Sequence, residues 1–308
     1  MQSIDMIKVK DVIIIGGSYA GLSAAMALGR SHRHVLIVDS GTPCNKQTPN
    51  AHNFLTNDGT PPAEIRALSL QQVLAYPTIQ LIPTLVVNTK RLENQLFEVT
   101  TSENKVYRAR KILFATGRKD IMLPIDGFAA CWGVSVLHCP YCHGYEVSRQ
   151  PLGLLANGDN AYELCRLIQN WSKELVLLTN GKANLTLEQR MWIESVGIVI
   201  REENIERLIH HNGLLQKVIF TDNSFVNLSA IFARIDSEPQ CSIPEDQLGC
   251  QLTDQGYLEV NSFMQTNIAG IYGAGDNTTM FRSLAVAVGA GTVAGAMLNK
   301  ELIEDDLG

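Results

Sequence analysis

The chain has 308 residues, of which 45% are hydrophobic and 18% are charged, a composition typical of a soluble globular enzyme. This length exceeds one average domain and predicts two, each large enough to bury its own core. The net charge of -6 gives no electrostatic reason to expect nucleic acid or an anionic membrane surface as a partner.

The N-terminal stretch MQSIDMIKVKDVIIIGG has a short apolar run before its glycines. That run is too short for the core of a signal peptide and far too short to span a bilayer. The seven cysteines are an odd number spread widely over the chain, which does not resemble a secreted disulfide framework. We therefore expect a cytoplasmic protein whose cysteines are mostly reduced.

Residues 11–30, DVIIIGGSYAGLSAAMALGR, predict a strand, a glycine turn and a helix. This is the context of a dinucleotide-binding fingerprint, in which Gly16 allows the tight turn and Gly21 allows close packing of helix on strand. Ser18 stands where a middle glycine is usual. The next strand ends in Asp39, where a carboxylate can accept hydrogen bonds from ribose hydroxyls.

Two later segments resemble further nucleotide-binding elements. Residues 105–120, KVYRARKILFATGRKD, predict a strand that becomes buried and stops at Thr116 and Gly117. Residues 267–279, NIAGIYGAGDNTT, predict a buried strand that ends in Gly275 and Asp276.

In this order and spacing, the three segments resemble the FAD-binding elements of flavoprotein disulfide reductases. The resemblance implies that Asp276 faces the ribityl chain, and that Ser283 and Leu284 begin a helix, from about residue 283 to 298, that packs close to the flavin. The full set of FAD contacts that the resemblance implies is Gly16, Gly17, Ser18, Ala20, Gly21, Asp39, Asn45, Thr116, Gly117, Gly275, Asp276, Ser283 and Leu284.

The predicted fold is α/β, with two Rossmann-like, three-layer ββα nucleotide-binding domains, the second inserted into the first. Residues 1–117 and 236–308 are predicted to form the FAD domain. Residues 118–235 are predicted to form the second domain, which carries a CxxC pair.

The second domain repeats the strand-turn-helix pattern in QPLGLLANGDNAYELCRLIQNW, with Ala156 in place of the first glycine. Gly158, Asp159 and Ala161 are the predicted NAD(P)H contacts. The following strand leads into LLTNGKANLT, where Lys182 is the one nearby cation, whereas a 2′-phosphate is usually bound by an arginine fork. NADPH is implied by the family resemblance, while NADH, or no nicotinamide nucleotide at all, remains an alternative.

The stretch HCPYCHGYE, residues 138–146, places two cysteines two residues apart. Such a pair can bind a metal, sit inertly in a loop or exchange electrons with a disulfide. A closed zinc site needs four ligands, and no second cluster with paired spacing is visible, so no metal is predicted.

The position of this pair, just beyond the first FAD segment, matches the low-molecular-weight thioredoxin reductases. CPYCHGYE further resembles a branch that includes the gliotoxin- and holomycin-type dithiol oxidases. The resemblance implies that Cys142 is the flavin-proximal sulfur and that Cys139 attacks the external disulfide. We expect His143 to serve as the acid or base, because each half-reaction moves protons as well as electrons.

The resemblance implies a homodimeric FAD enzyme that passes electrons from NAD(P)H through flavin and the Cys139–Cys142 pair to a thioredoxin-like protein or a small disulfide. A dithiol oxidase that uses oxygen, with little or no use of NADPH, is one alternative. A redox-sensing flavin-binding protein is another.

Overall fold

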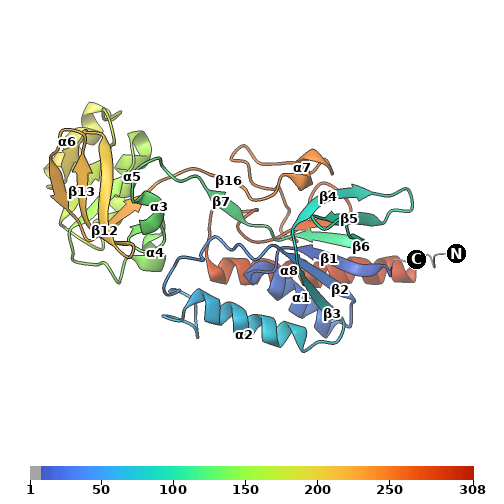
Figure 1. Cartoon of the computed structure of the whole chain (residues 1–308). Coiled ribbons are helices and arrows are strands. Elements are labelled where there is room, and N and C mark those ends of the chain that lie inside the picture. Colours follow the sequence, from blue (N-terminus) through green and yellow to red (C-terminus); the bar gives the residue numbers. More distant parts are fainter. Residues whose placement is uncertain (1–7) are drawn as a thin grey trace. The chain divides into compact units, whose positions relative to one another are not determined.

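The computed structural model describes residues 8–308 and divides the chain into two compact units (Figure 1). Residues 1–7, part of the N-terminal stretch in which no export signal is predicted, lie outside the described residues. The first unit comprises Met1–Lys46, Ala63–Lys119 and Glu238–Gly308, and the second comprises Gln47–Pro62 and Asp120–Ser237. Residues 47–62, which lie within the predicted segment 1–117, group with the second unit by their contacts.

The first unit is built on a seven-stranded sheet with the order β3-β2-β1-β6-β5-β4, in which β17 also pairs with β6. Strands β1, β2, β3, β6 and β17 are parallel, and β4 and β5 continue the sheet as antiparallel strands. Their bounds are β1 Lys10–Ile15, β2 Val35–Asp39, β3 Ile79–Pro83, β4 Val86–Arg91, β5 Phe97–Thr101, β6 Val106–Phe114 and β17 Ile271–Gly273. The central strands are apolar on both faces because both faces are covered.

Helices α1 (Tyr19–Arg30) and α8 (Leu284–Leu307) pack closely against each other. A Cβ on Gly291 would collide with the carbonyl oxygen of Ala20, and one on Gly295 would lie 2.7 Å from that of Ala24. Glycine therefore permits the approach of the two backbones. Helix α8 extends nine residues beyond the predicted end at residue 298. The first unit also contains α2 (Pro62–Leu74) and α7 (Ile243–Asp246).

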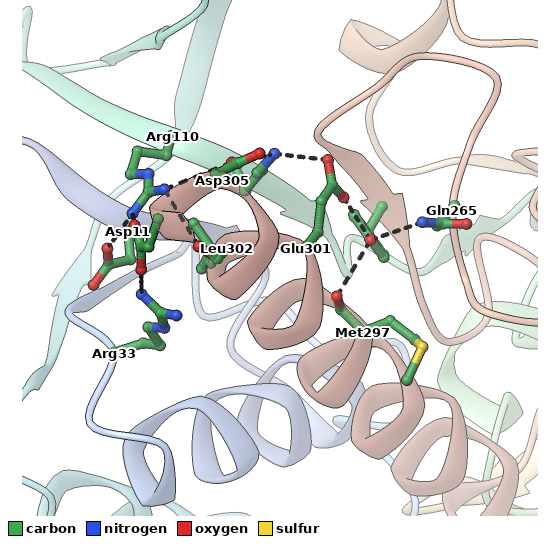
Figure 2. A network of polar contacts seen from close by, with 11 residues as sticks. Asp11, Arg33, Arg110, Gln265, Met297, Glu301, Leu302 and Asp305 are labelled. Carbon is green, nitrogen blue, oxygen red and sulfur yellow. Dashed lines mark hydrogen bonds and ion pairs between the residues drawn. The ribbon is translucent and has the colours of Figure 1, made fainter. Parts of the chain in front are cut away.

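The last turns of α8 are fastened to the sheet by a polar network (Figure 2). The Lys111 ammonium lies 2.6 Å from one carboxylate oxygen of Glu301 and 2.8 Å from Asp305. The Tyr272 hydroxyl donates to the other Glu301 oxygen at 2.6 Å. Lys111 and Tyr272 are almost fully buried. Glu301 offsets the cost of burying them, because its carboxylate pairs with the Lys111 charge and accepts the Tyr272 hydrogen bond. A neighbouring cluster joins Arg110 to acidic residues of β1 and α8.

The second unit has a five-stranded parallel sheet with the order β11-β10-β9-β15-β8 and an antiparallel meander, β12-β13-β14. The strands are β8 Val136–Leu137, β9 Leu152–Leu155, β10 Leu175–Leu178, β11 Val199–Arg201, β12 Ile205–His211, β13 Leu214–Phe220, β14 Phe225–Asn227 and β15 Ala230–Ala233. The helices are α3 Phe128–Cys131, α4 Pro140–His143, α5 Gly158–Ile168 and α6 Leu187–Ser195. Short strands β7 (Arg118–Asp120) and β16 (Ser237–Pro239) pair where the chain passes between the units.

Both units thus combine parallel and antiparallel strands: the first unit adds β5 and β4 to the edge of its parallel strands, and the second carries the separate antiparallel sheet β12-β13-β14. The predicted fold class is confirmed. Within residues 8–308, no helix is long and apolar enough to cross a membrane, and no group of His, Cys, Asp and Glu side chains is arranged to hold a metal ion.

Candidate functional site

The first glycine turn joins β1 to α1 and requires glycine at two points. Gly16 has φ +109°, and a Cβ there would collide with the carbonyl oxygen of Ala115. A Cβ on Gly21 would collide with the carbonyl oxygen of Gly16. The turn therefore holds helix, strand and the end of β6 closer together than side chains would allow.

An open pocket with about 640 Å³ of empty volume lies over this turn. Its lining includes five predicted FAD contacts, Gly16, Gly17, Ser18, Asp39 and Thr116, together with Arg66, Gln240 and Cys241. One Asp39 oxygen forms an ion pair with Arg66 of α2, which fixes the carboxylate at the end of β2.

The N-terminus of α1 opens on this pocket without a side-chain cap, because the Ser18 side chain makes no capping hydrogen bond. The first amides of a helix have no partner within the helix and favour an anion such as a pyrophosphate. The residues present therefore fit the nucleotide part of FAD.

Near this turn, the side chains of Tyr19 and Asn45 are hydrogen-bonded. Burial raises the pKa of Tyr19, and the Asn45 hydrogen bond opposes that shift. Asn45, another predicted FAD contact, thus lies beside the start of α1.

The remaining predicted FAD contacts cluster around the end of β17 and the start of α8. Gly275 has φ +92°, and a Cβ there would lie 2.9 Å from the Cβ of Ala20. Asp276 lies 3.4 Å from Arg282 and accepts from the Cys44 thiol at 3.9 Å. The hydroxyl of Ser283 accepts from the amide of Val286 and caps α8. Leu284 begins this helix, and Gly117, with φ +70°, follows Thr116 at the end of β6.

The CxxC pair lies in the second unit on the single-turn helix α4. Cys139 is the N-cap and Pro140 the first helical residue, a position at which proline's missing N–H costs nothing. This turn brings the two Cα atoms to 5.3 Å, and Cys139 and Cys142 form a disulfide.

His143 follows directly and ends α4. Burial lowers the pKa of His143, while Glu146 raises it and His52 lowers it further. Loss of solvent is the leading cause, since a half-buried imidazolium is poorly hydrated. The surroundings of His143 therefore favour the neutral imidazole over the imidazolium.

The second glycine turn, between β9 and α5, differs from the first. The Asn157 side chain caps α5 by accepting from the amide of Gly158 at 2.8 Å. The same side chain accepts from the amide of Asn184 and donates to the carbonyl oxygens of Thr179 and Lys182. It thereby fastens the loop after β10 to the helix N-terminus at which a pyrophosphate would bind.

The other predicted NAD(P)H contacts are also engaged within the protein. The carboxylate of Asp159 accepts from Gln189, and the side chain of Ala161 is fully buried in the core. Arg190 pairs with Glu202 and Arg201 with Glu203. The nearby guanidinium groups are thus already neutralised by carboxylates.

A family model described as "Pyridine nucleotide-disulphide oxidoreductase" matches residues 10–291. The chain belongs to this pyridine nucleotide-disulphide oxidoreductase family.

Individual relatives agree with this assignment. A thioredoxin reductase of Claviceps purpurea, tcpT, is 32% identical, with 96% of this chain and 95% of that protein covered. The crystal structure of an oxidoreductase from Agrobacterium tumefaciens is 31% identical with a TM-score of 0.89, covering 96% of this chain and 99% of the other. The crystal structure of HlmI is 29% identical with a TM-score of 0.92, covering 97% of this chain and 94% of the other.

Membership in the pyridine nucleotide-disulphide oxidoreductase family confirms the predicted enzyme class, a thioredoxin reductase-like flavoprotein oxidoreductase. It implies the use of a flavin and of a nicotinamide nucleotide.

Several residues of this pyridine nucleotide-disulphide oxidoreductase were not identified from the sequence. Arg66 joins Asp39 across 27 positions, and His52 reaches the CxxC helix from a segment that precedes it by more than eighty residues. Isolated basic residues in ordinary helices and loops carry no local pattern. The Asn157 cap alone had a signal, since asparagine before a helix is a typical N-cap.

Proposed function

We propose that this protein is an FAD-dependent thiol/disulfide oxidoreductase that uses the Cys139–Cys142 disulfide to exchange electrons with a thioredoxin-like protein or a small disulfide. The observation that carries the proposal is the disulfide itself, held on a one-turn helix in a chain of this family. A structural disulfide would have no need of a half-buried histidine directly after its second sulfur.

The proposed FAD site uses the glycine turn and the uncapped N-terminus of α1 for the pyrophosphate, and Asp39, fixed by Arg66, for a ribose hydroxyl. Asp276 is proposed to hydrogen-bond to the ribityl chain. Bound FAD would supply and accept electron pairs.

The protein side of the reaction is carried by three residues. Reduction of the disulfide breaks the S–S bond. The two sulfurs take up two electrons and one proton, which gives one thiol and one thiolate. We assign the thiolate to Cys142 and the attack on the external disulfide to Cys139. His143 accepts the proton from a sulfur in one direction and returns it in the other, which its lowered pKa allows near neutral pH.

We propose NADPH as the electron donor, with only modest selectivity over NADH. The loop that would contact the 2′-phosphate offers Lys182 and two arginines already paired with glutamates. A single ammonium lacks the bidentate geometry that gives strong phosphate discrimination. Steady-state kinetics with both nucleotides test this, and a thousandfold preference for NADPH would contradict it.

A second candidate function is a dithiol oxidase that passes electrons from a dithiol substrate to oxygen. The Asn157 cap favours it, because this side chain takes the Gly158 amide and fastens the loop over the helix where a nicotinamide nucleotide's pyrophosphate would bind.

Anaerobic titration of the purified, FAD-loaded protein separates the two functions. Bleaching of the flavin by NADPH supports the reductase. Bleaching by dithiols alone, followed by release of peroxide on admission of air, supports the oxidase. A protein that cannot be reconstituted with FAD would overturn both, and bleaching by neither reductant would favour a redox-sensing flavin protein.

We further propose a cytoplasmic homodimer with no nucleic-acid partner. Size-exclusion chromatography with light scattering tests the dimer, and cell fractionation tests the location. A monomer at micromolar concentration would contradict the first part.

A further inference from the structure

Within the second unit, a loop from early in the chain lies beside α4, the helix that carries the CxxC pair. Residues 47–62 precede the CxxC pair by some eighty positions, yet they pack with residues 120–237. In this loop, His52 places its ring 6.5 Å from the ring of His143, edge to face with an interplanar angle of 88°.

The loop is held in a constrained shape. The amide of Asn53 donates to the Asp58 carboxylate at 2.8 Å. The amide of Ala51 donates to the carbonyl oxygen of Thr60, and the carbonyl oxygen of Ala51 accepts from the amide of Gly59. Thr56 has φ +71°, which costs energy for a β-branched residue and persists only where the surroundings enforce it. The shape fixes the place of His52.

His52 also lies between two carboxylates. Its Nδ1 atom is 3.5 Å from an oxygen of Glu146 and 3.7 Å from one of Asp58. The His52 side chain is 19% exposed, whereas the side chains of Glu146 and Asp58 are 39% and 70% exposed, so water screens the Asp58 charge more than the Glu146 charge. Glu146 belongs to the turn after α4 and therefore acts on both imidazoles.

We propose that His52 is a positioning residue for the redox site, which orients the His143 imidazole and, with Asp58 and Glu146, sets the charge that His143 carries during thiol/disulfide exchange. The proposal rests on the acid/base role proposed for His143. It assigns to the loop a task in the reaction that its sequence position does not indicate.

The physical reason is electrostatic. The charged and titratable groups that face His143 are Glu146, from the turn after its own helix, and His52, from the loop. A proton on His52 opposes a proton on His143, whereas the Glu146 carboxylate favours one. His52 and Glu146 therefore act on His143 with opposite sign.

The test is a pH titration of His143 in the oxidised, FAD-loaded protein, monitored through the NMR signals of the histidine rings. The His143 signal is assigned as the one that is missing in His143→Gln. His52→Gln should raise the midpoint by roughly half a pH unit or more, and Glu146→Gln should lower it. A merely structural role would loosen the site in both variants, admit water to His143 and raise the midpoint in both. The matched control is His138→Gln, which changes another histidine of the same motif and should leave the midpoint unchanged.

A second measurement follows the chemistry. In protein reduced chemically without oxygen, the pH at which the cysteines become reactive to iodoacetamide should fall in His52→Gln, because His143 becomes the stronger base. Equal midpoints in wild type and His52→Gln, shifts of one sign in the His52 and Glu146 variants, or a shift in His138→Gln would each overturn the proposal. Neither measurement needs a nicotinamide nucleotide or a partner protein, so a failure of the proposed overall function is seen separately, in the absence of turnover.

Discussion

Removal of the Glu301 side chain should destabilise the first unit specifically. Glu301 accepts a 2.6 Å hydrogen bond from buried Lys111 and another from buried Tyr272. Hydrogen bonds to a charged group contribute about 1.5–3 kcal/mol each. Lys111 retains Asp305, and Glu301 is 22% exposed, so water replaces part of the loss. We expect Glu301→Ala to cost about 2–3 kcal/mol.

The matched control is Glu304→Ala, a substitution in the last turn of α8. Glu304 forms an ion pair with Lys300, at 3.9 Å between two side chains that are about two-thirds exposed, and its charge is the smallest of the causes that raise the pKa of Tyr272. Such a pair contributes less than about 0.5 kcal/mol. Both substitutions create the same residue in the same helix, so helix propensity cancels in the comparison.

The assay is urea unfolding of the FAD-loaded protein, with flavin fluorescence and far-UV circular dichroism as the two probes of the transition. The chain has three tryptophans, at positions 132, 171 and 192 in the second unit, so their fluorescence follows that unit separately. Flavin release should move to clearly lower urea in Glu301→Ala and stay near wild type in Glu304→Ala. Equal midpoints in the two variants would refute the reasoning that the network stabilises α8 on the sheet.

Three further outcomes are expected. Burial and Glu301 raise the pKa of Tyr272, so this hydroxyl contributes stability that is present below its unfolded pKa of about 10 and lost as pH rises above it. Tyr272→Phe should therefore lower the urea midpoint at neutral pH and make the midpoint fall less steeply with pH in the alkaline range. The same alkaline slope in wild type and variant would contradict this. Cys139→Ser should give a long-wavelength charge-transfer absorption from a Cys142 thiolate beside oxidised flavin, while Cys142→Ser should not, and the reverse pattern would exchange the two roles. Asp276→Ala should lose much of its FAD during dialysis, whereas full retention would show that the ribityl contact lies elsewhere.

The fold was predictable because its signals are local. Apolar runs of four or five residues predicted the parallel strands, and the steric demands of one turn were visible in Gly16 and Gly21, where any side chain would meet backbone. The pairing of Cys139 with Cys142 is likewise a property of one helical turn. The end of α8 was not predictable, because its last turns are polar and are held by Lys111 and Tyr272 from distant strands.

The composition of the site was decided by the tertiary structure. The sequence by itself determined that two nucleotide-type turns exist, but only the structure distinguishes them, since the first helix start is left open and the second is capped by Asn157 and fastened to the loop after β10. The ion pair of Arg66 with Asp39 and the approach of His52 to His143 join residues far apart in the chain. Such contacts depend on how loops return to the sheet, and an isolated charge or imidazole in the sequence carries no information about the partner that folding will bring to it.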